Sequence, residues 1–255
     1  MGFTLKMFTL DKLRKKGKQK LFVIPYFFTF ANAVFGLLSV IKTLEGDFVG
    51  AAYCIMFAGL MDLFDGKLAR AFGSTSYLGM ELDSLCDAVS FCFAPAILLY
   101  SWYFHNLGLI GLFVLSLYLC CGLLRLAKFN ISSANKSKNI NYFVGLTTTV
   151  SAFLIAQMVI HFQWISQNLL LFLKYPVGIA LFVTAIAMLM VSPIPFLSFK
   201  KINPKLSIVG GSLVSIVFII GFLKGFPLLF IGLFAYVLGC ISYFIFSRIS
   251  QLSVS

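Results

Sequence analysis

Apolar segments of membrane-spanning length recur along most of this 255-residue chain. A helix of about 20 predominantly apolar residues crosses the hydrocarbon layer of a bilayer and satisfies its own backbone hydrogen bonds there. A mean hydropathy of +1.00 excludes an ordinary soluble globular domain. We therefore expect an all-α, polytopic membrane bundle of about eight transmembrane helices. The segments lie at 21–41, 48–66, 84–104, 107–127, 142–162, 175–193, 206–223 and 226–247.

The basic residues orient these segments. If the eight segments alternate in direction, 17 of the 20 Lys and Arg residues fall on the side of the N-terminus. Only Lys42, Lys174 and Lys224 fall on the other side. Because basic loops stay in the cytoplasm, both termini are predicted to be cytoplasmic.

The same bias accounts for the net charge of +12, so we expect no nucleic-acid partner. Residues 1–20 form a basic juxtamembrane segment that either lies on anionic lipid or serves only as a topology signal.

The acidic residues are gathered in one stretch of the chain. Five of the eight Asp and Glu residues lie between residues 62 and 87, and none follows them. These five are Asp62, Asp65, Glu81, Asp83 and Asp87. Both histidines fall on the predicted outer side, so a general base close to these acids has to be a carboxylate.

Helical spacing divides this stretch into two stripes. The first follows i, i+3, i+4, i+7, i+8 and contains Asp62, Asp65, Gly66, Ala69 and Arg70. The second follows i, i+4, i+8 and contains Gly79, Asp83 and Asp87, with Glu81 off the line. A short link predicts antiparallel neighbouring helices whose acidic stripes face each other at the cytoplasmic end of the bundle.

Four converging aspartates require a cation, because they cannot all remain charged without one. Hard oxygen ligands favour Mg²⁺ or Mn²⁺, with Ca²⁺ as a further option, over zinc. A pair of such ions suits a diphosphate and its displacement. The lack of bulk at Gly66 and Ala69 lets a substrate approach the backbone, and Arg70 is placed to hold a phosphate oxygen. The alternative is an interhelical polar network that only sets helix packing.

The stretch "DLFDGKLARAFGSTSYLGMELDSLCD" resembles the CDP-alcohol phosphatidyltransferase family, whose pattern is D-x-x-D-G-x-x-A-R-x8-G-x3-D-x3-D. The resemblance implies that Asp62, Asp65, Asp83 and Asp87 are metal ligands and that Asp87 is also the catalytic base. It implies that Gly66, Ala69, Arg70 and Gly79 bind CDP-diacylglycerol. It also implies a homodimer whose site opens to the membrane.

Upstream, "IPYFFTFANAVFG" matches the first-helix pattern of this family and adds Thr29 and Asn32 to the CDP-diacylglycerol site. The resemblance divides the chain into a basic segment (1–20), a six-helix catalytic membrane domain (21–200) and a C-terminal helical pair (201–255). We expect a bacterial cytoplasmic membrane, and the distribution of basic residues places the active site at its cytoplasmic face.

Flanking sequence bears on the acceptor alcohol. "GMELDSLCDAVSFCFAPAILLY" and "LLRLAKFNIS" resemble the phosphatidylserine synthase branch of the family, which implies L-serine as the acceptor. Glycerol 3-phosphate or an inositol phosphate remains an alternative within the same chemistry. A cation transporter and a scaffold without activity are alternatives of other classes.

Four residues are candidates for binding the acceptor or a phosphate. Arg125, Lys128 and Asn130 are expected to bind lipid phosphate or the serine carboxylate, or else only to set topology. Glu81 is expected to contact the serine ammonium group or to cap the start of its helix. Lys128 stands where the branch has arginine, and the turn at Gly145 lacks the proline usual there.

Overall fold

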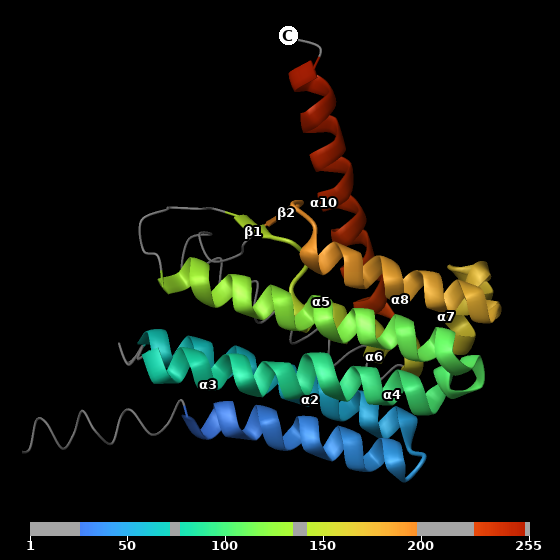
Figure 1. Cartoon of the computed structure of the whole chain (residues 1–255), viewed down its shortest axis with the longest axis horizontal. Coiled ribbons are helices and arrows are strands. Elements are labelled where there is room, and N and C mark those ends of the chain that lie inside the picture. The colour runs from blue at the N-terminus through green and yellow to red at the C-terminus, as the bar shows by residue number, and fades with distance from the viewer. Residues whose placement is uncertain (1–25, 72–76, 135–141, 198–226, 253–255) are drawn as a thin grey trace, which may run out of the picture.

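The computed structural model describes residues 26–71, 77–134, 142–197 and 227–252. The predicted basic segment 1–20 and the predicted span 206–223 lie outside these ranges. Within them, helices run back and forth to form a bundle, and the C-terminal part of α10 extends away from it (Figure 1).

The first two helices lie close to the first two predicted apolar segments. The first helix is Tyr26–Leu44. The elements after it are α2 (Phe48–Ala71), α3 (Tyr77–Asp87), the π-helical turn η1 (Ala88–Phe93), α4 (Ala94–Trp102), the 3₁₀ turn η2 (Phe104–Leu107), α5 (Gly108–Ala134), β1 (Tyr142–Val144), α6 (Thr148–Ile160), α7 (Phe162–Asn168), the 3₁₀ turn η3 (Leu171–Lys174), α8 (Pro176–Val191), β2 (Pro195–Leu197) and α10 (Leu228–Leu252).

Five helices in the described residues are long and apolar enough to cross a membrane. A sixth crossing is reached if α6 and α7, which are bent by 90° relative to each other, form one broken span. The predicted span 142–162 is therefore wrong in detail, because β1 and a turn occupy its start. α8 corresponds to the predicted span 175–193 but is only 16 residues long. A helical membrane protein is confirmed for these residues.

One pair of three-residue strands accompanies the helices. β1 and β2 are antiparallel, with Phe143 opposite Phe196. The turn that follows β1 contains Gly145 at φ +83°, whose N–H donates to the carbonyl of Ile194 at 3.0 Å. A side chain at Gly145 would collide with the carbonyl oxygen of Met190. Glycine therefore makes this turn without the proline expected there.

The surface of the bundle is apolar where a soluble protein would be polar. Leu109 is 84% exposed and Phe113 is 70% exposed on α5, and Leu181 is 61% exposed on α8. Large apolar side chains gathered on helices of spanning length are suited to contact with lipid.

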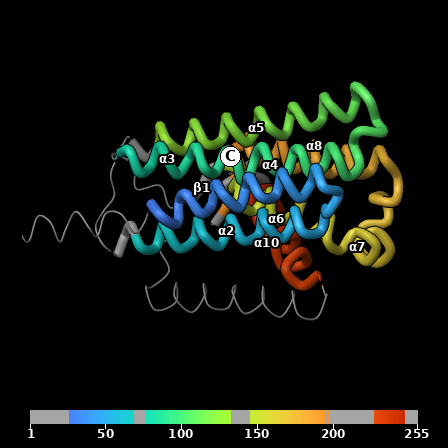
Figure 2. Tube along the Cα trace, turned by 90° about the horizontal axis from the view of Figure 1, so that it is seen from below, coloured from blue at the N-terminus to red at the C-terminus, as the bar shows by residue number. Residues whose placement is uncertain are grey.

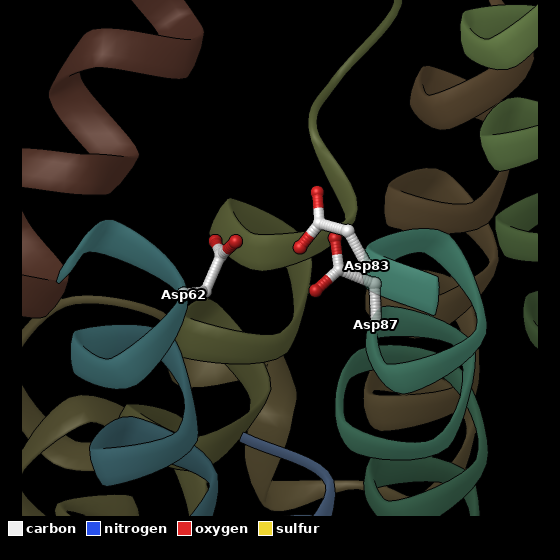
Figure 3. Close-up of side chains that lie close together, drawn as sticks. All are labelled: Asp62, Asp83 and Asp87. Atoms are coloured by element: carbon white, nitrogen blue, oxygen red, sulfur yellow. The ribbon is translucent and has the colours of Figure 1, made fainter. Parts of the chain in front are cut away.

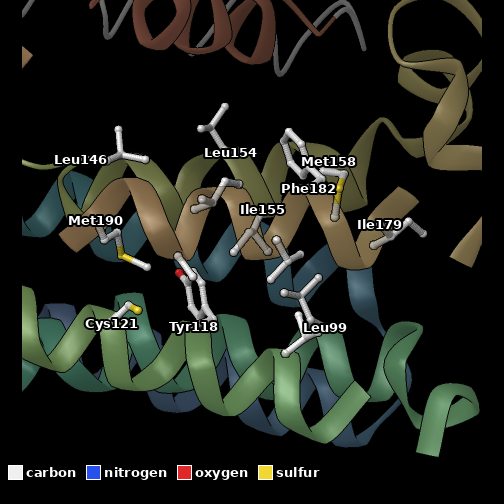
Figure 4. Packing of buried hydrophobic residues seen from close by; sticks show 14 of the residues in the cluster. Leu99, Tyr118, Cys121, Leu146, Leu154, Ile155, Met158, Ile179, Phe182 and Met190 are labelled. Atoms are coloured by element: carbon white, nitrogen blue, oxygen red, sulfur yellow. The ribbon is translucent and has the colours of Figure 1, made fainter. Parts of the chain in front are cut away.

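Two apolar clusters hold the helices together. The larger one joins α4, α5, α6, α8 and α10, with Leu99, Tyr118, Ile155 and Phe182 among its members (Figure 4). The second joins α2, α4 and α6 through small residues. Ala51 and Ala52 of α2 and Ala152 and Ala156 of α6 belong to it and are buried. Small side chains allow helix backbones to approach closely, which suits packing within a bilayer.

The π-helical turn η1 lies directly after Asp87, between α3 and α4. Insertions of this type shift the register of a helix and often occur at functional sites. Neighbouring helices bind this turn on two sides: Ser90 Oγ donates to the carbonyl of Asn32 at 2.9 Å, and the Tyr118 hydroxyl donates to the carbonyl of Phe91 at 2.9 Å. Gly36 makes room for Ser90, which would collide with a side chain there. The turn is thus fixed between the first helix and α5.

Both views show α3 and the end of α5 at one end of the bundle, and α7 at the other (Figures 1 and 2). Asp62 lies in the C-terminal half of α2. Asp47, just before α2 begins, is 15 residues earlier. At 1.5 Å per residue, this places Asp47 about 20 Å from Asp62 along the helix. The two groups of acids therefore occupy opposite ends of the bundle.

Candidate metal and catalytic site

Three carboxylates meet at the α3 end of the bundle. Asp62 comes from α2, and Asp83 and Asp87 come from α3, where a separation of four residues puts them on one face (Figure 3). Each of the three offers an oxygen atom that lies within 4.8 Å of the other two. All three side chains are partly buried. The two helical stripes thus face each other through these residues.

Asp65 lies three residues after Asp62 on α2 and is almost completely buried, at 5% exposure. It is not one of the three residues whose oxygens meet within 4.8 Å. The structure therefore brings together three of the four aspartates named from the motif and holds the fourth in the adjacent interior.

The carboxylate of Asp87 is held by the first helix. Asn32 Nδ2 donates to Asp87 Oδ1 at 3.0 Å, and Asn32 is fully buried. Ser90, three residues after Asp87, donates in turn to the Asn32 backbone. One hydrogen bond joins Asn32 to Asp87 itself and the other joins Asn32 to the turn that follows Asp87, so the Asp87 carboxylate has a defined orientation. No described residue donates a hydrogen bond to Asp87 Oδ2.

The residues expected to line the nucleotide lipid occupy the same end. Thr29 is buried one turn before Asn32 on the first helix. Gly66 follows Asp62 by one turn on α2, and Gly79 precedes Asp83 by one turn on α3. Ala69 and Arg70 belong to the last turn of α2. The side chains of these last two residues lie outside the described part of the structure.

The acceptor candidates separate into three different environments. Arg125 is buried at 9% exposure, and its Nη1 donates to Thr148 Oγ1 at 3.2 Å. Lys128 is exposed. Asn130 Nδ2 donates to Glu81 Oε2 at 3.2 Å, while Ser84 Oγ donates to Asn130 Oδ1 at 2.8 Å. The expected group of three basic and polar residues is therefore not one cluster.

Glu81 belongs to the network with Asn130 and Ser84, which joins α3 to α5. Described α3 begins at Tyr77, and its first turn contains no acidic residue. The capping alternative for Glu81 is therefore wrong, because this residue lies beyond the first turn and its carboxylate accepts from a side chain of another helix.

Sequence reasoning missed three polar residues at this end: Ser84, Ser90 and Thr148. The two serines stand within the stretch that resembles the phosphatidylserine synthase branch, but neither is an ionisable group, so neither drew attention. Thr148 lies in the run "TTT" directly after the Gly145 turn. A hydroxyl-rich run after a glycine turn is typical of a helix start, and α6 begins there.

The donor atoms at the three-carboxylate site fit a hard divalent cation. All three are carboxylate oxygens from α2 and α3, and no His or Cys of the described residues belongs to the group. Oxygen-only sites of this composition favour Mg²⁺, Mn²⁺ or Ca²⁺.

Comparison with known proteins agrees with this chemistry. The profile of the CDP-alcohol phosphatidyltransferase family matches residues 22–191. The CDP-diacylglycerol–serine O-phosphatidyltransferase of Helicobacter pylori is 33% identical over 205 residues, which cover 78% of this chain and 83% of the relative. The Bacillus subtilis protein of the same name is 34% identical over 178 residues, covering 70% of this chain and 92% of that protein. The archaetidylserine synthase of Methanothermobacter thermautotrophicus is 36% identical over 131 residues, which cover 51% of this chain and 54% of the relative.

Proposed function

Because the chain belongs to the CDP-alcohol phosphatidyltransferase family, we propose that it transfers the phosphatidyl group of CDP-diacylglycerol to L-serine, giving phosphatidylserine and CMP. The single observation that carries this proposal is the meeting of Asp62, Asp83 and Asp87. The names of the Helicobacter pylori and Bacillus subtilis relatives support serine as the acceptor, since both matches cover most of this chain and most of the relative.

Asp62, Asp83 and Asp87 would hold the metal, Mg²⁺ or Mn²⁺, with Asp65 beside them as a fourth ligand. The family pattern supports a pair of ions. When bound, divalent metal neutralises the diphosphate and the charge that develops on the CMP leaving group.

Asp87 acts as the base. The serine hydroxyl oxygen forms a bond to the β-phosphorus of CDP-diacylglycerol, the bond from that phosphorus to the bridging oxygen breaks, and CMP leaves with that oxygen. Asp87 takes the hydroxyl proton. Asn32 supports this role because it holds Oδ1 and leaves Oδ2 to face a ligand or a proton.

The CDP portion of the lipid is bound by the small residues Gly66, Ala69 and Gly79, together with Thr29. Arg70 at the end of α2 holds a phosphate oxygen. The acyl chains remain in the bilayer, beside the exposed apolar faces of the helices. Lys128, Asn130 and Glu81 are proposed to contact the acceptor or a phosphate, together with Arg125.

For the whole protein we propose eight spans, cytoplasmic termini and a homodimer. The charge bias of the loops supports an active site on the cytoplasmic face of a bacterial cytoplasmic membrane. Five helices of the described residues, or six if α6 and α7 form one broken span, are long and apolar enough to cross a membrane.

The test supplies purified protein in mixed micelles with CDP-diacylglycerol, Mn²⁺ or Mg²⁺, and labelled L-serine, glycerol 3-phosphate or inositol 1-phosphate. We expect CMP release and labelled phosphatidylserine only with L-serine, and no product after chelation of the metal. CMP release with glycerol 3-phosphate and none with L-serine would assign a different acceptor. No CMP release with any acceptor would reject phosphatidyl transfer.

A further inference from the structure

Arg125 is a buried cation with little to balance it. Its side chain is nine-tenths buried, and Nη1 donates to the neutral hydroxyl of Thr148. The buried Nε has no hydrogen-bond partner among the described residues, and no described carboxylate lies within ion-pair distance of the guanidinium. Burying a charge without an opposite charge is costly, so this side chain is suited to an anion.

The start of α6 adds to this preference. Thr148 is the first residue of the 13-residue helix α6, and the Thr147 side chain accepts the N–H of Val150 as its cap. The remaining first-turn N–H groups have no partner within the helix, and the helix dipole makes this end positive. Arg125 contacts Thr148, the first residue of α6. The guanidinium and the first-turn N–H groups of this helix are therefore hydrogen-bond donors close to one another.

The helix that carries Arg125 packs on the π-helical turn that follows Asp87, the proposed base: the Tyr118 hydroxyl donates to the carbonyl of Phe91, and Gly122, one turn before Arg125, lies against Cys92. The Asp87 carboxylate already accepts a hydrogen bond from Asn32 and lies close to the carboxylates of Asp62 and Asp83. An anion from a substrate is therefore the better partner for Arg125. Because α5 packs on the turn directly after Asp87, an anion held by Arg125 is placed on the same side of the bundle as the carboxylate that receives the acceptor proton.

We propose that Arg125, Thr148 and the first turn of α6 form the subsite for the carboxylate of the acceptor amino acid. This inference rests on the proposed function. The hydroxyl and carboxylate of serine are separated by two carbon atoms, so a hydroxyl held at Asp87 keeps the carboxylate close by. The planar guanidinium matches a carboxylate in two-point geometry, and lysine would not.

The test compares Arg125→Gln, Arg125→Lys and Thr148→Val with the unaltered enzyme, using L-serine and ethanolamine, which lacks the carboxylate. Loss of a hydrogen bond to a charged group corresponds to about 10- to 100-fold, so we expect Arg125→Gln to raise the KM for L-serine by about that factor. The preference for L-serine over ethanolamine falls by a similar factor. The KM for CDP-diacylglycerol stays within about twofold, since the subsite belongs to the acceptor.

The control is Lys67→Gln, which removes an exposed positive charge on α2 at the same end of the bundle. It leaves both KM values unchanged, whereas a general effect of positive charge on the lipid surface would alter them. Thr148→Val keeps the side-chain shape and removes the hydroxyl, so it raises the serine KM by a few-fold. This variant carries the test if Arg125→Gln fails to fold.

The outcomes are distinct. A raised KM for CDP-diacylglycerol with an unchanged KM for L-serine would assign Arg125 to a lipid phosphate and overturn the subsite. The subsite would also be overturned if Thr148→Val and Arg125→Lys both kept the preference of the unaltered enzyme for L-serine over ethanolamine. If the unaltered enzyme makes no phosphatidylserine, the proposed function itself has failed.

Discussion

Acids stand at both ends of this helical bundle, in opposite chemical settings. At the α7 end, Lys42 binds Glu45 at 3.0 Å and Asp47 at 3.8 Å, and all three side chains are exposed. Asp47 also accepts the N–H of Gly50 at 2.8 Å, so it caps the start of α2. These acids are balanced within the protein and exposed to water.

At the α3 end, Asp62, Asp83 and Asp87 come within 4.8 Å of one another and are partly buried. Like charges this close raise the free energy of the ionised site unless a cation is present. This difference shows that the number of acidic residues alone does not predict a metal site. Convergence from two helices predicts one, because only convergence requires a ligand.

The sharpest test of this comparison exchanges one carboxylate at each end for an amide. Asp87→Asn removes the base, so we expect kcat to fall by about 10²- to 10⁴-fold, with CDP-diacylglycerol binding still measurable. Asp47→Asn keeps the cap, because Asn caps helices as well as Asp, and it leaves turnover unchanged. Turnover is measured as CMP release. Full activity in Asp87→Asn would remove the base role.

Asn32 is expected to have the next largest effect. Asn32→Ala frees the Asp87 carboxylate from its amide partner, so kcat falls by about 10- to 100-fold while the KM for L-serine changes little. Ser39→Ala is the control on the same helix, because the buried Ser39 hydroxyl has no hydrogen-bond partner among the described residues. Equal losses in both variants would show that Asn32 supports only helix packing.

Two glycines extend the comparison to the backbone. Gly145 at the α3 end and Gly46 at the other end have φ values of +83° and +81°. Gly46 has open space around its α-carbon, whereas a side chain at Gly145 meets Met190. We expect Gly46→Ala to cost about 1–2 kcal/mol and Gly145→Ala about 2–5 kcal/mol of unfolding free energy. Thermal unfolding in detergent measures both, and equal costs would contradict the collision.

The smallest effect is expected from Lys42. Lys42→Ala removes both exposed ion pairs at the α7 end, and pairs of this kind contribute little because water screens them. We expect no resolvable change in Tm or in turnover at moderate salt. A clear loss of stability would mean that this end is as dependent on its charges as the other.

Much of the site was predictable because helical spacing is local. Asp83 and Asp87 are one turn apart in any helix, so their shared face follows from the sequence. Their meeting with Asp62 followed from a short link between two helices. The span predicted at 142–162 was wrong because hydropathy does not register a turn: the Gly145 turn and β1 depend on pairing with β2, about 50 residues later.

The sequence by itself determined a helical membrane protein, the two stripes of aspartates and the family. These depend on apolar run length and on spacings within single helices. Only the tertiary structure decided that Asn32 holds Asp87, that Glu81 pairs with Asn130, and that Arg125 lies buried against Thr148. Each of these contacts joins residues from different helices, so it depends on how the helices pack and not on their order in the chain.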